Sequence, residues 1–145
     1  MSSHLFENKE FFKELTTMIK DNQVVSFPVK GTSMLPFLKN GLTEVFLQKS
    51  IGYKKLDICL FEYKGKTLLH RIIKIHNNQY TFQGDHSYNI EVVDESNIIA
   101  KVNYYITSNK TIQPNSSWIA LKVRLFLLFK QIKRIARRIL KGKRI

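Results

Sequence analysis

Three short clusters in the sequence hold residue types that could together perform nucleophilic catalysis. The first is KGTSMLPFLKNG at residues 30–41, in which Ser33 follows a Gly-Thr pair and precedes Met34 and Pro36. A serine beside glycine and proline is also typical of a turn, where its hydroxyl only satisfies nearby backbone groups. The segment alone leaves both interpretations of Ser33 open, as a nucleophile and as a structural residue.

The other two clusters hold an imidazole and two carboxylates. His70 lies in the apolar run TLLHRIIKI, where it needs either a structural partner or a function. Asp85 and Glu91 lie in QGDHSYNIEVVD, after a Gly-Asp turn, and carboxylates near a turn are commonly solvated or cap their own backbone. A serine, a histidine and an acid can also form a triad. In a triad the imidazole takes the hydroxyl proton and the acid fixes the imidazole tautomer.

Taken in order, the clusters resemble the signal peptidase I superfamily of serine endopeptidases, which includes the self-cleaving SOS repressors. KGTSMLPFL resembles the box G-x-S-M-x-P-x-L, and LDICLFEYKGKTLLHRIIKI resembles the strands that follow it. QGDHSYNIE is similar to the Gly-Asp box and NIIAKV to the closing strand, so the likeness covers residues 24–105. It implies that Ser33 is the nucleophile of a peptidase that cleaves a peptide or leader sequence without a metal or cofactor.

The resemblance also implies which branch of the superfamily is closer. Bacterial signal peptidases and SOS repressors pair the serine with a lysine, whereas the archaeal and endoplasmic-reticulum signal peptidases use a histidine and a carboxylate. His70 fits the second pattern, and a histidine is mostly neutral near pH 7 and so able to accept a proton. In this family the acid follows the Gly-Asp turn by several residues, so Glu91 ranks a little ahead of Asp85.

The family pattern further implies a substrate cleft and an oxyanion hole. Met34 and Pro36 are expected to shape the wall of a cleft that accepts an extended peptide with small side chains. Members often carry a hydroxyl two positions before the nucleophile, but Gly31 stands there. Thr32 or another backbone N–H is therefore expected to be the second oxyanion donor.

Two more positions depart from the family pattern. Leu42 stands where many members have Asp, and Leu56 stands where the residue before Asp57 is usually Gly. Neither replacement is expected to affect the chemistry.

The surrounding sequence predicts the elements that position these clusters. Residues 1–23 are predicted to contain an amphipathic helix, and residues 24–107 hold short β-rich runs separated by turn signals. The apolar face of that helix is formed by Phe11, Phe12, Leu15, Met18 and Ile19. The expected fold is a small, mostly β, signal-peptidase-like domain, with residues 108–117 as a linker to a basic amphipathic helix at 118–145.

The net charge of +13 is concentrated in that last segment. All eleven acids lie between Glu7 and Glu95, whereas residues 118–145 contain ten Lys or Arg and no acid. At helical spacing, one side of the segment is apolar: Leu125, Leu128, Ile132, Ile135 and Ile139. A helix of this kind is expected to lie in the interface of an anionic membrane, and the alternative is a helix packed on the domain with a solvated basic face. The residues predicted to bind the membrane are Trp118, Lys130, Lys133, Arg134, Arg137 and Arg138.

Three classes of function compete on these observations. The leading one is a serine endopeptidase that acts on a peptide or protein precursor in the cytoplasm, peripheral on the inner face of the membrane. Its location is expected from the single cysteine, Cys59, and from the lack of a recognisable signal peptide or spanning segment. A nucleic-acid-binding regulator is suggested by the pI near 9.9, but one helix before the β region is too little for a helix-turn-helix. The third class is a membrane-binding or partner-binding module on an inactive protease fold.

Overall fold

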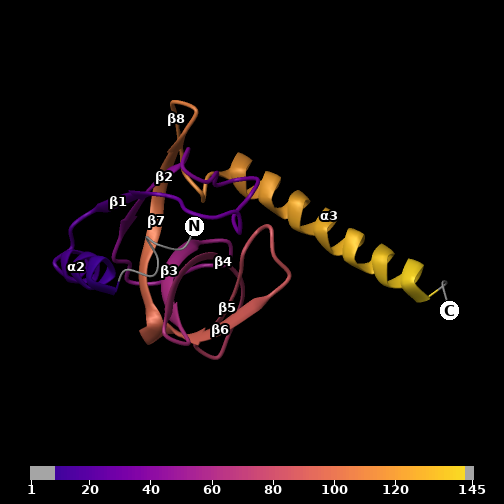
Figure 1. Ribbon diagram of the computed structural model, residues 1–145, viewed down its shortest axis with the longest axis horizontal. Helices are drawn as coiled ribbons and strands as arrows, with labels where there is room; N and C mark the ends of the chain where they lie inside the picture. The colour runs from indigo at the N-terminus through magenta and orange to yellow at the C-terminus, as the bar shows by residue number, and fades with distance from the viewer. Residues whose placement is uncertain (1–8, 143–145) are drawn as a thin grey trace. The chain divides into compact units, whose positions relative to one another are not determined.

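The computed structural model describes residues 9–142, which form two compact units that divide between Pro114 and Asn115. The first unit is mostly β and begins with a helix, and the second consists mainly of one long helix (Figure 1). The predicted fold class, mostly β with a helix near each end, is confirmed.

The first unit is built on an antiparallel sheet of eight strands. The strands are β1 (Val25–Pro28), β2 (Glu44–Gln48), β3 (Ile58–Tyr63), β4 (Lys66–His76), β5 (Gln79–Gln83), β6 (Ile90–Asp94), β7 (Ile98–Thr107) and β8 (Lys110–Ile112). Their order across the sheet is β1-β2-β7-β3-β4-β5-β6, and β8 pairs with β7 off this path. A short 3₁₀ helix, η1 (Glu95–Asn97), connects β6 to β7.

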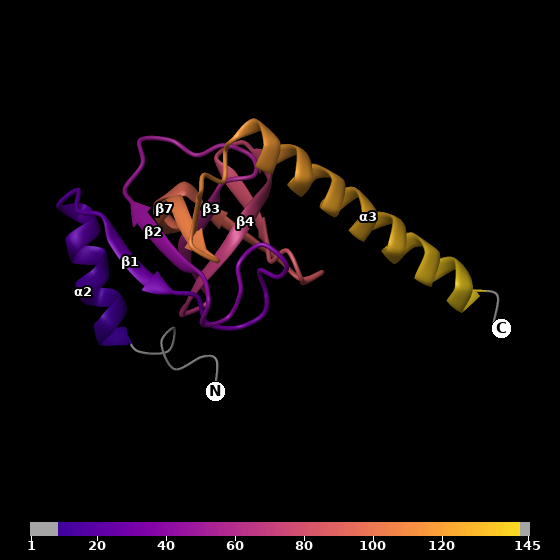
Figure 2. The ribbon, with the colours of Figure 1, turned by 90° about the horizontal axis from the view of Figure 1, so that it is seen from above.

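One face of helix α2 (Lys9–Lys20) closes the larger of two hydrophobic cores. Phe12, Leu15 and Ile19 are buried at helical spacing, and the ring of Phe12 meets that of Phe27 on β1 edge to face. Figures 1 and 2 both show α2 alongside β1. Met18 is 43% exposed, so it does not share the buried face expected for it.

The second core packs among strands β3 to β7, and β3 to β6 curl round in Figure 1. The rings of Phe61 and Phe82 stack in it with their centroids 3.9 Å apart. Because successive residues of a strand face opposite sides of the sheet, alternate positions of β4, β5 and β6 point into this core. This alternation decides which polar side chains can reach the candidate site.

Three boundaries differ from those expected. Residues 90–94 form strand β6, whereas the sequence identified this stretch only as part of the cluster that follows the Gly-Asp turn. The expected linker at 108–117 contains the short strand β8, which extends the β7 hairpin. Helix α3 (Ser117–Gly142) begins one residue earlier than predicted. The ends of the predicted helices, at residues 1–8 and 143–145, lie outside the described residues.

Neither helix described between residues 9 and 142 combines the length and the apolar composition needed to cross a bilayer.

Candidate active site

The candidate nucleophile lies in the loop between β1 and β2. Two backbone hydrogen bonds close the base of this loop, from Val29 N–H to the Thr43 carbonyl and from Gly41 N–H to the Val29 carbonyl, each 2.8 Å. Met34 and Leu38 are buried in the larger core and anchor the loop from inside. The loop thus holds Ser33, which is half-buried, on a backbone with fixed ends.

A side-chain bond fixes the approach to Ser33. Gly31 adopts a φ of +89°, which favours glycine, and its N–H donates to Oδ1 of Asn40 over 3.0 Å. The Gly31 N–H is therefore already in use. Among the described residues the backbone N–H of Ser33 donates no hydrogen bond, which leaves it available as an oxyanion donor.

His70 reaches the nucleophile from strand β4. Its Nε2 atom lies 3.2 Å from the Oγ atom of Ser33, within hydrogen-bonding distance. The imidazole is buried, and its ring centroid lies 6.1 Å from that of Phe61 in the second core. When the ring proton is on Nδ1, Nε2 accepts from the Ser33 hydroxyl, which is the arrangement that a general base needs.

Glu91 reaches the other side of the same imidazole from strand β6. Its Oε1 atom lies 3.1 Å from Nδ1 of His70, and both side chains are 9% exposed. The strand register explains this meeting. Glu91 pairs with Phe82 of β5 and Phe82 pairs with Ile72 of β4, so Glu91 shares a face with Ile72 and with His70 two residues away.

Asp85 serves a different partner. Its two carboxylate oxygens accept from Nε and Nη2 of Arg71, each at 2.9 Å, and both side chains are 1% exposed. Arg71 follows His70 in β4 and points to the opposite face, where it also donates to the Leu56 carbonyl over 3.0 Å. The guanidinium carbon lies 5.4 Å from the ring centroid of Phe37, in the nucleophile loop. The structure therefore places Glu91 next to His70 and assigns Asp85 to the support of the turn.

Gly84 sets the spacing between this turn and the nucleophile. A Cβ atom built on Gly84 would lie 2.6 Å from the Ser33 carbonyl oxygen and 3.2 Å from Nε2 of His70, so only glycine fits without a shift. The N–H of His86 donates to the same Ser33 carbonyl over 2.8 Å. The Gly-Asp turn and the nucleophile loop are thereby joined directly.

The residues expected to bind substrate are not all at the surface. Thr32 and Pro36 are exposed beside Ser33, as a role in substrate contact requires. Met34 is 2% exposed and belongs to the core, which corrects its expected place on the cleft wall. The loop makes one helical turn in which the N–H of Leu38 bonds to the Met34 carbonyl, and that turn directs both side chains inward.

The remaining reactive groups lie apart from this arrangement. Burial raises the pKa of the Cys59 thiol well above its ordinary value, and the Asp57 carboxylate adds to the effect, so this thiol stays protonated and a poor nucleophile. His76 and His86 are exposed. No three His, Cys, Asp or Glu side chains within residues 9–142 gather into a group that could hold a metal ion.

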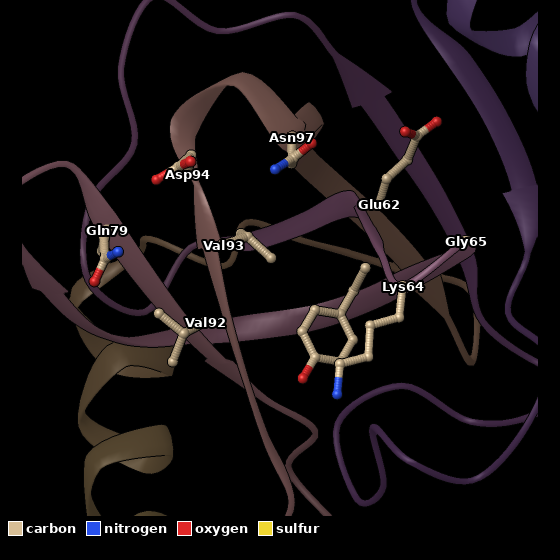
Figure 3. Close-up of a pocket in the computed structure, with 9 residues that line it drawn as sticks. Glu62, Lys64, Gly65, Gln79, Val92, Val93, Asp94 and Asn97 are labelled. Carbon is tan, nitrogen blue, oxygen red and sulfur yellow. The ribbon is translucent and has the colours of Figure 1, made fainter.

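A pocket of about 300 Å³ lies beside the β3–β4 turn (Figure 3). Its lining is largely polar and includes Glu62, Lys64, Gln79, Asp94 and Asn97. None of its lining residues belongs to the group of Ser33, His70 and Glu91. We therefore do not assign the chemistry to this pocket.

The predicted membrane-binding residues all lie on α3, which forms most of the second unit. Lys130 is half-buried, and the other five are exposed: Trp118, Lys133, Arg134, Arg137 and Arg138.

Comparison with protein-family models and with curated proteins finds no match to this chain. The site is therefore defined by its own geometry.

Two of its residues were not predicted to act there, Arg71 and Gly84. The sequence held a signal for each of them. Arg71 is a charged residue inside an apolar strand, and a buried charge needs a partner. Gly84 is the glycine that directly precedes Asp85.

Proposed function

We propose that the protein is a serine endopeptidase of the signal peptidase type, in which Ser33 is the nucleophile and His70 the general base. The observation that carries the proposal is the order of contacts, with Ser33 Oγ at 3.2 Å from one imidazole nitrogen and Glu91 Oε1 at 3.1 Å from the other. A serine and an acid on opposite nitrogens of one buried imidazole form the arrangement that defines a triad.

The reaction follows from these positions. Ser33 Oγ bonds to the carbonyl carbon of the scissile peptide bond while Nε2 of His70 takes the hydroxyl proton. The C–N bond then breaks, and the imidazolium returns the proton to the leaving amine. Water, deprotonated by His70, hydrolyses the acyl ester and restores the Ser33 hydroxyl.

Electrostatic support comes from two groups. The Glu91 carboxylate stabilises the imidazolium while it carries the proton, because it is buried close to Nδ1. The unused N–H of Ser33 is suited to donate to the oxyanion that develops on the substrate carbonyl. Thr32 is the nearest exposed hydroxyl in the loop sequence and is our candidate for the second donor.

The proposed substrate is an extended segment of a peptide or protein precursor, and the proposed reaction needs no metal or cofactor. The proposed location is the cytoplasm, peripheral on the inner face of the membrane. A single cysteine supports this location, because Cys59 cannot form a disulfide within the chain and is buried as a free thiol.

The proposal is tested by exposing the full chain to a complex peptide mixture and identifying new termini by mass spectrometry. New termini should appear with the parent chain and with the control Ser96→Ala, which alters an exposed serine, and should be absent with Ser33→Ala. Equal termini from the parent and Ser33→Ala, or none from the parent, would show that the serine mechanism is wrong.

A probe that needs no known substrate gives a second test. A fluorophosphonate transfers its phosphonyl group to an activated serine oxygen, with loss of fluoride and of the hydroxyl proton. We expect one adduct on Ser33 in the parent chain and none after His70→Ala.

A further inference from the structure

Helix α3 carries a continuous apolar stripe that is exposed along its whole length. The stripe consists of Trp118, Leu121, Leu125, Leu128, Phe129, Ile132, Ile135, Ile139 and Leu140, whose exposed fractions run from 48% to 64%. At 3.6 residues per turn these positions fall within about 140° of the helix circumference, and they extend for about 33 Å along the axis. Scattered exposed apolar residues are ordinary, but a stripe of this length marks an interaction surface.

In its second half, the opposite side of the same helix is cationic. Eight cations lie within α3, at Lys122, Arg124, Lys130, Lys133, Arg134, Arg137, Arg138 and Lys141, and the helix contains no acid. Six of them lie in its last 13 residues, 130–142, where every apolar residue belongs to the stripe except Ala136. This half of α3 is therefore divided cleanly between an apolar and a positively charged side.

We propose that α3 is a docking helix for an anionic lipid bilayer surface, with its apolar stripe in the interface and its cations among the headgroups. Apolar burial and attraction to anionic lipid act together on such a helix. Trp118, at one end of the stripe, is the residue type that favours the headgroup level. The inference rests on α3 alone and is independent of whether Ser33 cleaves peptides.

A second copy of the chain fits the same surface less well. The stripe positions recur every three and four residues, as in a coiled-coil seam. The positions flanking that seam hold Lys122, Arg124 and Arg138 with no acid, so two copies would bring like charges together. Phe129 and Leu140 also widen the stripe beyond the two positions per heptad that a seam uses.

Nucleic acid fits only half of the surface. A phosphate backbone would match the cations, but it would leave the apolar stripe in water. A bilayer with anionic headgroups matches both sides of α3, so charge and apolar area favour the same partner.

The experiment uses the full chain with vesicles of phosphatidylcholine, with and without 30% phosphatidylserine. Trp118 is the only tryptophan, so its emission reports directly on the stripe. We expect a blue shift and co-sedimentation with the anionic vesicles, both weakened by added salt. Binding that is equal for the two compositions and insensitive to salt would contradict the role of the cations.

Matched variants separate the two sides of α3. Replacing four exposed cations by Gln should weaken partition into anionic vesicles at least 100-fold: Lys133, Arg137, Arg138 and Lys141. Each cation near an anionic surface raises the partition coefficient roughly fivefold. The control replaces four exposed lysines of the first unit by Gln, with the same change in net charge: Lys55, Lys66, Lys74 and Lys110. Equal losses in both variants would overturn the proposal, because they would show that overall charge alone is responsible.

The apolar side is tested in the same way. Leu128→Gln with Ile132→Gln should weaken binding at least tenfold, whereas Leu42→Gln with Ile51→Gln, two exposed apolar residues of the first unit, should leave it unchanged. Circular dichroism confirms that α3 is still helical in the variant.

Three further results would overturn the proposal. One is that the parent chain is a dimer in sedimentation and the Leu128→Gln, Ile132→Gln variant is a monomer, while both bind vesicles equally. Another is duplex DNA that displaces the chain from anionic vesicles at matched salt. A third is failure of the parent chain to bind anionic vesicles at all. Ser33→Ala should bind vesicles like the parent, so a failure of the peptidase proposal would be seen separately.

Discussion

Glu91 Oε1 lies 3.1 Å from Nδ1 of His70, an ion-pair distance, but among the described residues neither Nδ1 nor the other carboxylate oxygen, Oε2, has a hydrogen-bond partner, and both are buried. A buried carboxylate costs free energy unless its charge is compensated. The imidazolium that forms when Ser33 loses its proton would supply that compensation at the moment of reaction. The proposed role of Glu91 therefore lies in catalysis more than in stability.

Glu91→Gln should lower the rate of peptide cleavage or of phosphonylation by about 10²–10⁴-fold, because it removes the charge that stabilises the imidazolium. The melting temperature should change little, because the neutral amide is cheaper to bury than a carboxylate with one orphaned oxygen. Rates and thermal unfolding are measured on the same preparations. A rate within threefold of the parent would rule out Glu91 as the supporting acid.

Asp85→Asn should produce the opposite pattern, a large loss of stability. The guanidinium of Arg71 would lose a two-point partner while it remains 1% exposed, which costs about 3–5 kcal/mol in the free energy of unfolding. Urea unfolding gives this quantity, and Asp94→Asn, which alters an exposed acid, is the control. Unchanged stability together with a complete loss of activity would instead place Asp85 in the catalytic group.

Gly84→Ala should impair both the fold and the site. The new methyl group would lie 2.6 Å from the Ser33 carbonyl, so the turn must move away from the nucleophile loop. We expect a loss of about 1–3 kcal/mol in stability and at least a tenfold slower phosphonylation of Ser33. Gly52→Ala is the matched control, because nothing lies within 4 Å of a Cβ there. If both variants behave like the parent, the close approach at Gly84 has no importance.

Local patterns were sufficient to predict the mostly β fold, whereas Ser33 and His70 were singled out by the order of short motifs along the chain, through their resemblance to the signal peptidase superfamily. The choice between Glu91 and Asp85 depends on register across β4, β5 and β6, which local pattern does not determine. Strand β6 was itself missed, so the alternation that buries Glu91 could not be used. To predict that Asp85 pairs with Arg71, one would also have to know which residues of β4 lie on each of its two faces.

Two further residues show how tertiary contacts override local preferences. Met34 was expected in the substrate cleft, but a helical turn in the loop directs it into the core. Leu56 has a φ of +79°, the region that favours glycine. Its backbone is held by hydrogen bonds with Ile72 and Arg71. Such tertiary contacts override the preferences that a sequence pattern expresses.

Ionisation of the Tyr53 hydroxyl should lower the stability of the fold at alkaline pH. Burial is the largest cause that raises the pKa of Tyr53 from 10.0 to about 12, and the negative charge of Glu95 adds to it. Because the folded-state value is the higher one, this contribution is complete below about pH 10 and is lost as the pH rises toward 12. Urea unfolding at several alkaline pH values should show the decline, and Tyr53→Phe should reduce its slope. An equal slope in the two chains would contradict the burial of this hydroxyl.

The activity of the site should fall on acidification, because a protonated His70 cannot accept the Ser33 proton. With one essential base, the rate of phosphonylation should fall about tenfold per pH unit at the acidic end of the profile. The fluorophosphonate rate is measured between about pH 8 and pH 5, with circular dichroism at each point to separate loss of activity from acid unfolding. Histidine would be the wrong base if the rate stayed constant over this range in a folded chain.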